Sequence, residues 1–191
     1  MKKNPIFLGF TIAFSMMVFS ILIYRFYIDQ DNEFLLDNPT EKTCKIILNG
    51  KEYILAPFQN VKIEKLKKIN TLKCFIEDSL VQIDTIFNIE SVTKGIINPL
   101  KQDYYIYNRY YGFSKNKDSL QRAFLSKKIR IDSVEYMGDI KIKNEILISD
   151  FYLNLNQDFP KLLKKQDSLI PISKVFRKND FINFYNTLFK K

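Results

Sequence analysis

The chain contains no histidine, which removes the most common general base and a frequent metal ligand at once. Ser-His-Asp and Cys-His catalysis and histidine-bound zinc are therefore excluded. Cys44 and Cys74 are the only two cysteines, and their wide spacing matches no zinc or iron–sulfur pattern. Neither GxGxxG nor GxxxxGK[ST] occurs, so nucleotide sites of those types have no support. We predict no metal and no cofactor.

Three enzymatic routes remain open without histidine, and one of them, a metal ion bound by carboxylates, has no motif to support it. A Ser–Lys pair could act as nucleophile and base, and Ser126-Lys127 and Ser173-Lys174 are adjacent pairs, although sequence neighbours on a strand point apart. Two carboxylates such as Asp132 and Glu135 could cleave a glycoside, but both have the setting of ordinary exposed strand and turn residues. We therefore assign no catalytic residue.

The segment 104–111 concentrates tyrosines around one arginine, and these residue types dominate binding hot spots. On a strand, alternate residues share a face, so one face of this segment must contribute to the core. The alternatives are structural packing and an exposed interaction surface. The residues of that candidate surface are Tyr105, Tyr107, Arg109 and Tyr110.

Two interpretations of Cys44 and Cys74 are open. In an oxidising compartment they could form a disulfide, which would contribute roughly 3–4 kcal/mol in the loop-entropy account. The alternative is a pair of buried free thiols that pack as small apolar residues.

Residues 4–24 carry no charged side chain. As a helix they would extend over roughly 31 Å, which fits a bilayer core of about 30 Å. No small-x-small cleavage site follows, so we predict an uncleaved signal-anchor over 1–28 with the lipid bilayer as partner. Lys2 and Lys3 precede the segment and favour a cytoplasmic N-terminus.

This orientation predicts a single-pass protein of the cytoplasmic (inner) membrane, with its C-terminal domain outside the cytoplasm. Gly9-x-x-x-Ala13 is a small-xxx-small pattern that offers weak support for a homodimer. The net charge is +9, but the lysines are dispersed and no run of five basic residues occurs. We therefore expect no nucleic-acid partner, and an envelope protein is the candidate partner instead.

After a juxtamembrane linker at 29–40, the region 41–112 shows short alternating segments at intervals of about ten residues. Asn49-Gly50 between two such segments is the strongest short hairpin signal. This spacing is typical of an antiparallel sandwich. The predicted strands are 43–48, 52–55, 61–66, 72–77, 80–87 and 104–107.

The region 113–191 predicts a β-meander through segments near 129–134, 140–142 and 146–148, with helical parts packed on it. Short helices are expected over 118–124 and 158–166. Phe181, Phe184, Tyr185 and Leu188 recur at helical spacing and predict an amphipathic C-terminal helix that docks on the sheet. The fold class is α+β: one N-terminal transmembrane helix followed by a mainly antiparallel, sandwich-like β domain.

Three stretches carry a resemblance, DNPTEKTCKIILNGKEYILAPFQNVKIEKL, INPLKQDYYIYNRYYG and KVFRKNDFINFY. Together they resemble a group of uncharacterised membrane-anchored bacterial proteins with an Asn-Pro-Thr turn and an Asp/Asn-Gly-Lys-x-Tyr hairpin. The chain departs from the group where a Gly-His turn would follow, since it has Asn70-Thr71 there. The resemblance implies a β architecture and leaves activity open.

The function expected from the sequence is non-catalytic, either binding or a structural role within an envelope complex. A membrane-tethered hydrolase that acts on an envelope polymer through carboxylates is the first alternative. A cytoplasm-facing adaptor with inverted topology is the second.

Overall fold

The computed structural model describes residues 5–24, 33–64, 66–77, 79–89, 92–112, 127–161 and 170–189. These residues form two helices and a series of short strands, so the predicted β-rich character is confirmed. The elements are α1 (Pro5–Ile23), β1 (Glu33–Asp37), β2 (Cys44–Leu48), β3 (Lys51–Leu55), β4 (Asn60–Ile63), β5 (Ile69–Ile76), β6 (Ser79–Asn88), β7 (Lys94–Ile97), β8 (Tyr104–Tyr111), β9 (Lys128–Ile131), β10 (Val134–Met137), β11 (Ile140–Lys143), β12 (Leu147–Ile148), β13 (Ile170–Arg177) and α3 (Lys178–Phe189).

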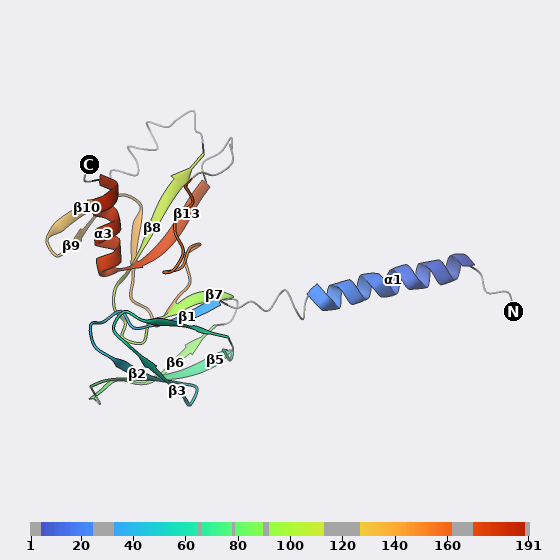
Figure 1. The fold of residues 1–191 in the computed structure, drawn as a ribbon, viewed down its shortest axis with the longest axis horizontal. Helices are drawn as coiled ribbons and strands as arrows, with labels where there is room; N and C mark the ends of the chain where they lie inside the picture. Colours follow the sequence, from blue (N-terminus) through green and yellow to red (C-terminus); the bar gives the residue numbers. More distant parts are fainter. Residues whose placement is uncertain are drawn as a thin grey trace.

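Helix α1 lies apart from the β-rich body and corrects the prediction for the N-terminus (Figure 1). Its 19 residues include the polar side chains of Thr11, Ser15 and Ser20. No helix in the described part of the chain combines the length and the apolar character that crossing a membrane requires. The predicted signal-anchor at 1–28, and with it the single-pass inner-membrane location, is therefore wrong.

Two four-stranded sheets pack face to face in the lower part of the body (Figure 1). The outer sheet has the order β3-β2-β5-β6 and is antiparallel throughout. The central sheet has the order β12-β7-β1-β4, and its β1–β7 pair is parallel. Apolar residues from both sheets, among them Phe34, Ile46 and Leu72, form the core between them.

The hairpin β2–β3 follows from local chemistry, and its prediction is confirmed. Asn49 and Gly50 connect the strands with φ of 52° and 82°, and positive φ at both central residues is the type I′ geometry that Asn-Gly favours. Cys44, Ile46 and Leu48 alternate with more exposed residues and face the core.

Strand β1 lies inside the segment 29–40 that the sequence predicts as a linker. Phe34 and Leu36 contribute to the core below the central sheet, whereas Leu35 packs above it with Ile96 and Tyr104. A strand buried on both faces reads as a continuous apolar run rather than an alternation. The described end of this segment is thus a central strand of the fold.

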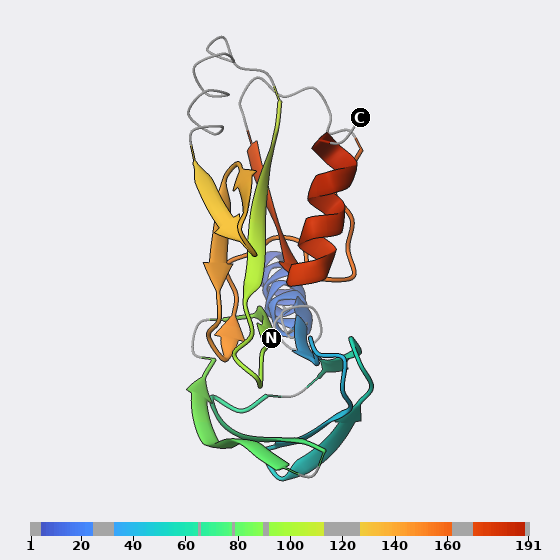
Figure 2. The same cartoon turned by 90° about the vertical axis from the view of Figure 1, so that its left-hand side faces the viewer.

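A three-stranded sheet of order β11-β8-β13 lies above the central sheet. Figure 2 shows α3 alongside β8 and β13, and the predicted C-terminal amphipathic helix is confirmed. Phe181 is fully buried against Tyr105, Tyr136 and Phe176. An aromatic core therefore fixes α3 on the sheet.

Strands after position 127 join three different sheets rather than one meander. β9 pairs with β10, β11 pairs with β8, and β12 pairs with β7. The pairings of β7 and β8 therefore connect the predicted parts 41–112 and 113–191. The helix predicted at 118–124 lies outside the described residues, as does 162–166 of the second one, whereas 158–161 is irregular.

Candidate functional site

In the candidate site, two strands are each followed by the same dipeptide, Asn-Pro. β1 is followed by Asn38-Pro39 and β7 by Asn98-Pro99. The two strands are parallel, with Leu36 opposite Ile97, so both loops leave the same edge of the central sheet.

The side chain of Asn38 stabilises the first Asn-Pro loop through hydrogen bonds to its backbone. Its side chain is fully buried, and Nδ2 donates to the backbone oxygens of Lys42 (2.8 Å) and Ala56 (2.9 Å). Its Oδ1 accepts hydrogen bonds from the backbone and hydroxyl of Thr40. A buried amide that is satisfied on both sides fixes the loop conformation.

Asn98 does the same for the second loop. Its buried Nδ2 donates to the backbone oxygens of Gln102 (2.8 Å) and Glu145 (3.3 Å), and its Oδ1 accepts from the backbone N–H of Gln102 (3.1 Å). The two Asn-Pro loops are thus positioned by equivalent side chains.

A buried polar group joins the central sheet to the three-stranded sheet beside these loops. Asp37 at the end of β1 accepts two hydrogen bonds from the guanidinium of Arg177 and one from the hydroxyl of Tyr104. Asp37 is 0% exposed and the Arg177 side chain 13% exposed. Tyr104 and Arg177 are opposite each other in the β8–β13 pair, which explains how both reach one carboxylate.

This environment shifts two pKa values. Burial, followed by the charge of Asp37 and its hydrogen bond, raises the pKa of Tyr104 well above its ordinary value. Burial alone would lower the pKa of Arg177, but the hydrogen bond and charge of Asp37 raise it. The tyrosine therefore remains a neutral donor and the arginine a permanent cation at the base of the site.

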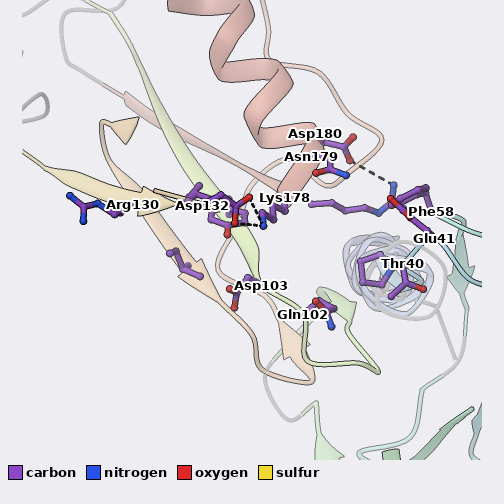
Figure 3. Close-up of a pocket in the computed structure, with 15 residues that line it drawn as sticks. Thr40, Glu41, Phe58, Gln102, Asp103, Arg130, Asp132, Lys178, Asn179 and Asp180 are labelled. Atoms are coloured by element: carbon purple, nitrogen blue, oxygen red, sulfur yellow. Dashed lines mark hydrogen bonds and ion pairs between the residues drawn. The ribbon is translucent and has the colours of Figure 1, made fainter. Parts of the chain in front are cut away.

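A cleft of about 580 Å³ opens above this group (Figure 3). Its walls come from both Asn-Pro loops, the start of β8, the β9–β10 hairpin, β11 and the N-terminal end of α3. The lining residues are Pro39, Thr40, Glu41, Phe58, Gln102, Asp103, Tyr105, Arg130, Ile131, Asp132, Ile142, Arg177, Lys178, Asn179 and Asp180.

Charged side chains of both signs line the cleft, and some of them form ion pairs. Lys178 Nζ lies 2.7 Å from the carboxylate of Asp132, and Arg177 NH1 lies 3.7 Å from that of Asp180 (Figure 3). Asp132 and Lys178 are 65% and 43% exposed, so water screens their attraction and the pair stabilises the fold only weakly. Such pairs can exchange partners with a ligand at little cost.

The four residues predicted as an interaction surface lie in different environments in the structure. Tyr105 lines the cleft, but it is nearly fully buried and its ring stacks on Phe181 at 5.2 Å. Tyr107 shares that face and contacts the rings of Phe159 and Phe184. These two tyrosines belong mainly to the aromatic core.

Arg109 and Tyr110 lie further along β8. The guanidinium of Arg109 lies over the rings of Tyr111 and Phe159, at 5.3 and 5.9 Å. Tyr110 points to the other face of the strand and donates to Asp139 at 2.6 Å. The structure therefore brings only Tyr105 of the four into the cleft.

The residues considered for catalysis are also separated. Asp132 lines the cleft, whereas Glu135 forms ion pairs with Lys128 and Arg130 across the β9–β10 hairpin. Ser173 Oγ accepts a hydrogen bond from the backbone N–H of Tyr152. Its neighbour Lys174 pairs with Asp158. Ser126 of the other Ser–Lys pair lies outside the described residues.

Within the described residues, no group of three or more acidic or cysteine side chains is arranged to hold a metal ion. Comparisons with protein families, with curated proteins and with solved structures found no match for this chain. The resemblance to membrane-anchored bacterial proteins stays a prediction.

The sequence analysis did not identify Asn38-Pro39 and Asn98-Pro99 as parts of one site. Their recurrence at the ends of two apolar segments is the signal that could have led to the cleft. The acidic and basic lining residues carry no such signal, because single charged residues in loops are common everywhere in the chain.

Proposed function

We propose that this protein is a non-catalytic binding module, and that the cleft binds a basic segment of a partner polypeptide. The observation that carries the proposal is a local reversal of charge. The chain as a whole has a net charge of +9, yet four carboxylates line the cleft against three basic side chains. Those carboxylates belong to Glu41, Asp103, Asp132 and Asp180.

The basic side chains of the lining are partly neutralised already. Arg177 forms an ion pair with buried Asp37, and Arg130 forms one with Glu135 on the same β9–β10 hairpin. Lys178 and Asp132 neutralise each other, so the excess of negative charge comes from Glu41, Asp103 and Asp180. A ligand that enters therefore meets an excess of negative charge, which favours lysine or arginine side chains.

The size and the rest of the lining suit a short stretch of polypeptide. A volume of about 580 Å³ lies within the range of ligand sites in proteins. Phe58, Ile131 and Ile142 provide apolar contact area, and Gln102 and Asn179 provide amide groups that can pair with a peptide backbone. These residue types serve binding and orientation without requiring a reacting group.

Peptide binding to the full chain tests the proposal. Lysine- and arginine-rich peptides and acidic peptides of equal length would be compared by fluorescence anisotropy. The double variant Glu41→Gln/Asp103→Asn removes two cleft charges. The control Glu52→Gln/Asp150→Asn removes two charges from other exposed positions, so both variants have the same net charge.

We expect basic peptides to bind the wild type, and the cleft variant to bind them about tenfold more weakly, while the control variant changes little. Added salt weakens all binding that depends on exposed charges. Equal losses in the two variants would show that the peptides respond only to overall charge. The proposal fails on that result, and equally if no basic peptide binds.

A further inference from the structure

Cys44 and Cys74 lie on neighbouring strands of the outer sheet. In the β2–β5 pairing Cys44 is opposite Ile76 and Ile46 is opposite Cys74, so the cysteines are diagonal neighbours. Both face the core between the outer and central sheets, and both are 0% exposed. Their Sγ atoms are 2.8 Å apart, and the structure records both as free thiols.

We propose that Cys44 and Cys74 form an intramolecular disulfide that joins β2 to β5, a covalent modification made while the chain folds. A disulfide requires two side chains that leave neighbouring backbones and meet on one face, and these two do. The core around them is apolar, so the bonded pair leaves no polar group without a partner. The proposal stands independently of the function proposed for the cleft.

In the folded, reduced protein the two thiols have different pKa values. The hydrogen bond from Cys74 lowers the pKa of Cys44 despite its burial. The same hydrogen bond, together with burial, raises the pKa of Cys74. In the reduced, folded protein the thiol of Cys44 therefore loses its proton more readily than the thiol of Cys74.

The oxidant is an external disulfide, such as oxidised glutathione or the oxidised dithiol of a thiol oxidoreductase. One cysteine thiolate attacks that disulfide, forms a mixed disulfide and expels one thiolate. The second cysteine then attacks the mixed disulfide and expels the other thiolate. Two electrons pass to the external disulfide, and the two cysteine protons end on its two thiols. Because the cysteines are buried in the folded protein, the exchange has to precede closure of the core.

The bond would close a loop that leaves one sheet and returns to it. Between the two cysteines the chain forms β3, then β4 in the central sheet, and comes back to β5 beside β2. Closing a loop of 30 positions restricts the unfolded chain. We expect the oxidised protein to melt roughly 10 °C above the reduced protein.

The test uses the full chain in a mild detergent, because apolar side chains of α1 are exposed. The chain is unfolded, reduced and refolded in a mixture of oxidised and reduced glutathione. It is then denatured and alkylated, and mass spectrometry counts the alkyl groups. The proposal predicts none, with both cysteines alkylated only after reduction.

Two alkyl groups on refolded, unreduced protein with intact circular dichroism would overturn the proposal. A glutathione adduct or a covalent dimer would overturn it too. The double variant Cys44→Ala/Cys74→Ala serves as control, since reductant should lower the Tm of the wild type and leave that of the variant unchanged. The alkyl count on the wild type remains decisive if the variant does not fold.

Discussion

Arg177 and Asp37 are separated by 140 positions in the sequence and meet as a buried ion pair with two hydrogen bonds. Arg177 ends β13 and precedes α3, and Asp37 ends β1 and precedes the first Asn-Pro loop. The pair therefore connects two walls of the cleft at their base. Tyr104 donates to the same carboxylate and connects the start of β8 to them.

Replacing Asp37 by asparagine should destabilise the protein strongly. The change removes the buried counter-charge of Arg177 and leaves only the exposed carboxylate of Asp180 at 3.7 Å. Breaking a buried ion pair in this way typically costs about 3–5 kcal/mol in the free energy of unfolding. Urea denaturation followed by circular dichroism measures this loss. Glu77→Gln is the control, because Glu77 and its partner Lys42 are well exposed and such pairs contribute about 1 kcal/mol or less. Similar losses in both variants would contradict the buried-pair account.

Asn98→Asp should loosen the second Asn-Pro loop. Aspartate keeps the acceptor but loses the donor that bonds to the backbone oxygens of Gln102 and Glu145, and it places a charge in a buried position. We expect a loss of about 2–4 kcal/mol in stability, together with weaker binding of basic peptides. Asn156→Asp, at an exposed position paired with Asn60, should change little. A stable Asn98→Asp protein with unchanged binding would argue against the role of this loop.

Phe181→Ala should detach the first turn of α3. The Phe181 ring is fully buried among Tyr105, Tyr136 and Phe176, and truncating such a ring costs about 3–5 kcal/mol. Phe189→Ala at the other end of the helix is the control, since that side chain is 53% exposed. Denaturation midpoints of the two variants give the comparison. If the terminal variant lost as much as the buried one, the aromatic core would not be what holds α3.

The lowered pKa of Asp139 predicts that the stability of the fold depends on pH. Burial alone would raise the pKa of Asp139, but hydrogen bonds from Tyr110, Asn108 and Lys127 lower it. Since the folded-state pKa lies below the unfolded value of about 3.9, the carboxylate stabilises the fold above that pH. The contribution is lost as the pH falls through the folded-state pKa.

The measurement compares wild type with Asp139→Asn in urea at pH 7, 4 and 3. We expect the wild type to be more stable at pH 7 and the difference to shrink toward pH 3. Asp150→Asn, at an exposed carboxylate, provides the control. A difference between wild type and Asp139→Asn that stays constant over this range would refute the prediction.

Local signals predicted the elements whose chemistry is contained within a few residues. The β2–β3 hairpin follows from Asn49-Gly50, and α3 follows from apolar residues at helical spacing. Strand β1 was not predicted because it is short, is buried on both faces and has the acidic residues Glu33 and Asp37 at its ends, so its segment was interpreted as a polar linker. Alternation of apolar and polar residues identifies strands that bury one face. It does not identify short strands that bury both faces.

The membrane-spanning helix was predicted from an uncharged segment of suitable length that no cleavage site follows. A helix forms over Pro5–Ile23, but no helix in the described part of the chain is long and apolar enough to cross a membrane. The pairings that build the cleft depend on contacts between distant positions, such as β7 with β12 and Asp37 with Arg177. Local patterns of polarity and spacing do not specify such distant pairings, so the full lining of the cleft could not be predicted from them.

The central claim is that the cleft binds a basic polypeptide segment, and hydrogen–deuterium exchange with a bound basic peptide tests it most directly. The account predicts slower exchange in the amides of residues 40–41, 102–105 and 178–181, which line the cleft or adjoin it. Exchange in β2 and β3 should remain unchanged. Protection confined to the outer sheet around Lys45, Ile54 and Phe75, which line a separate hollow, would contradict the account.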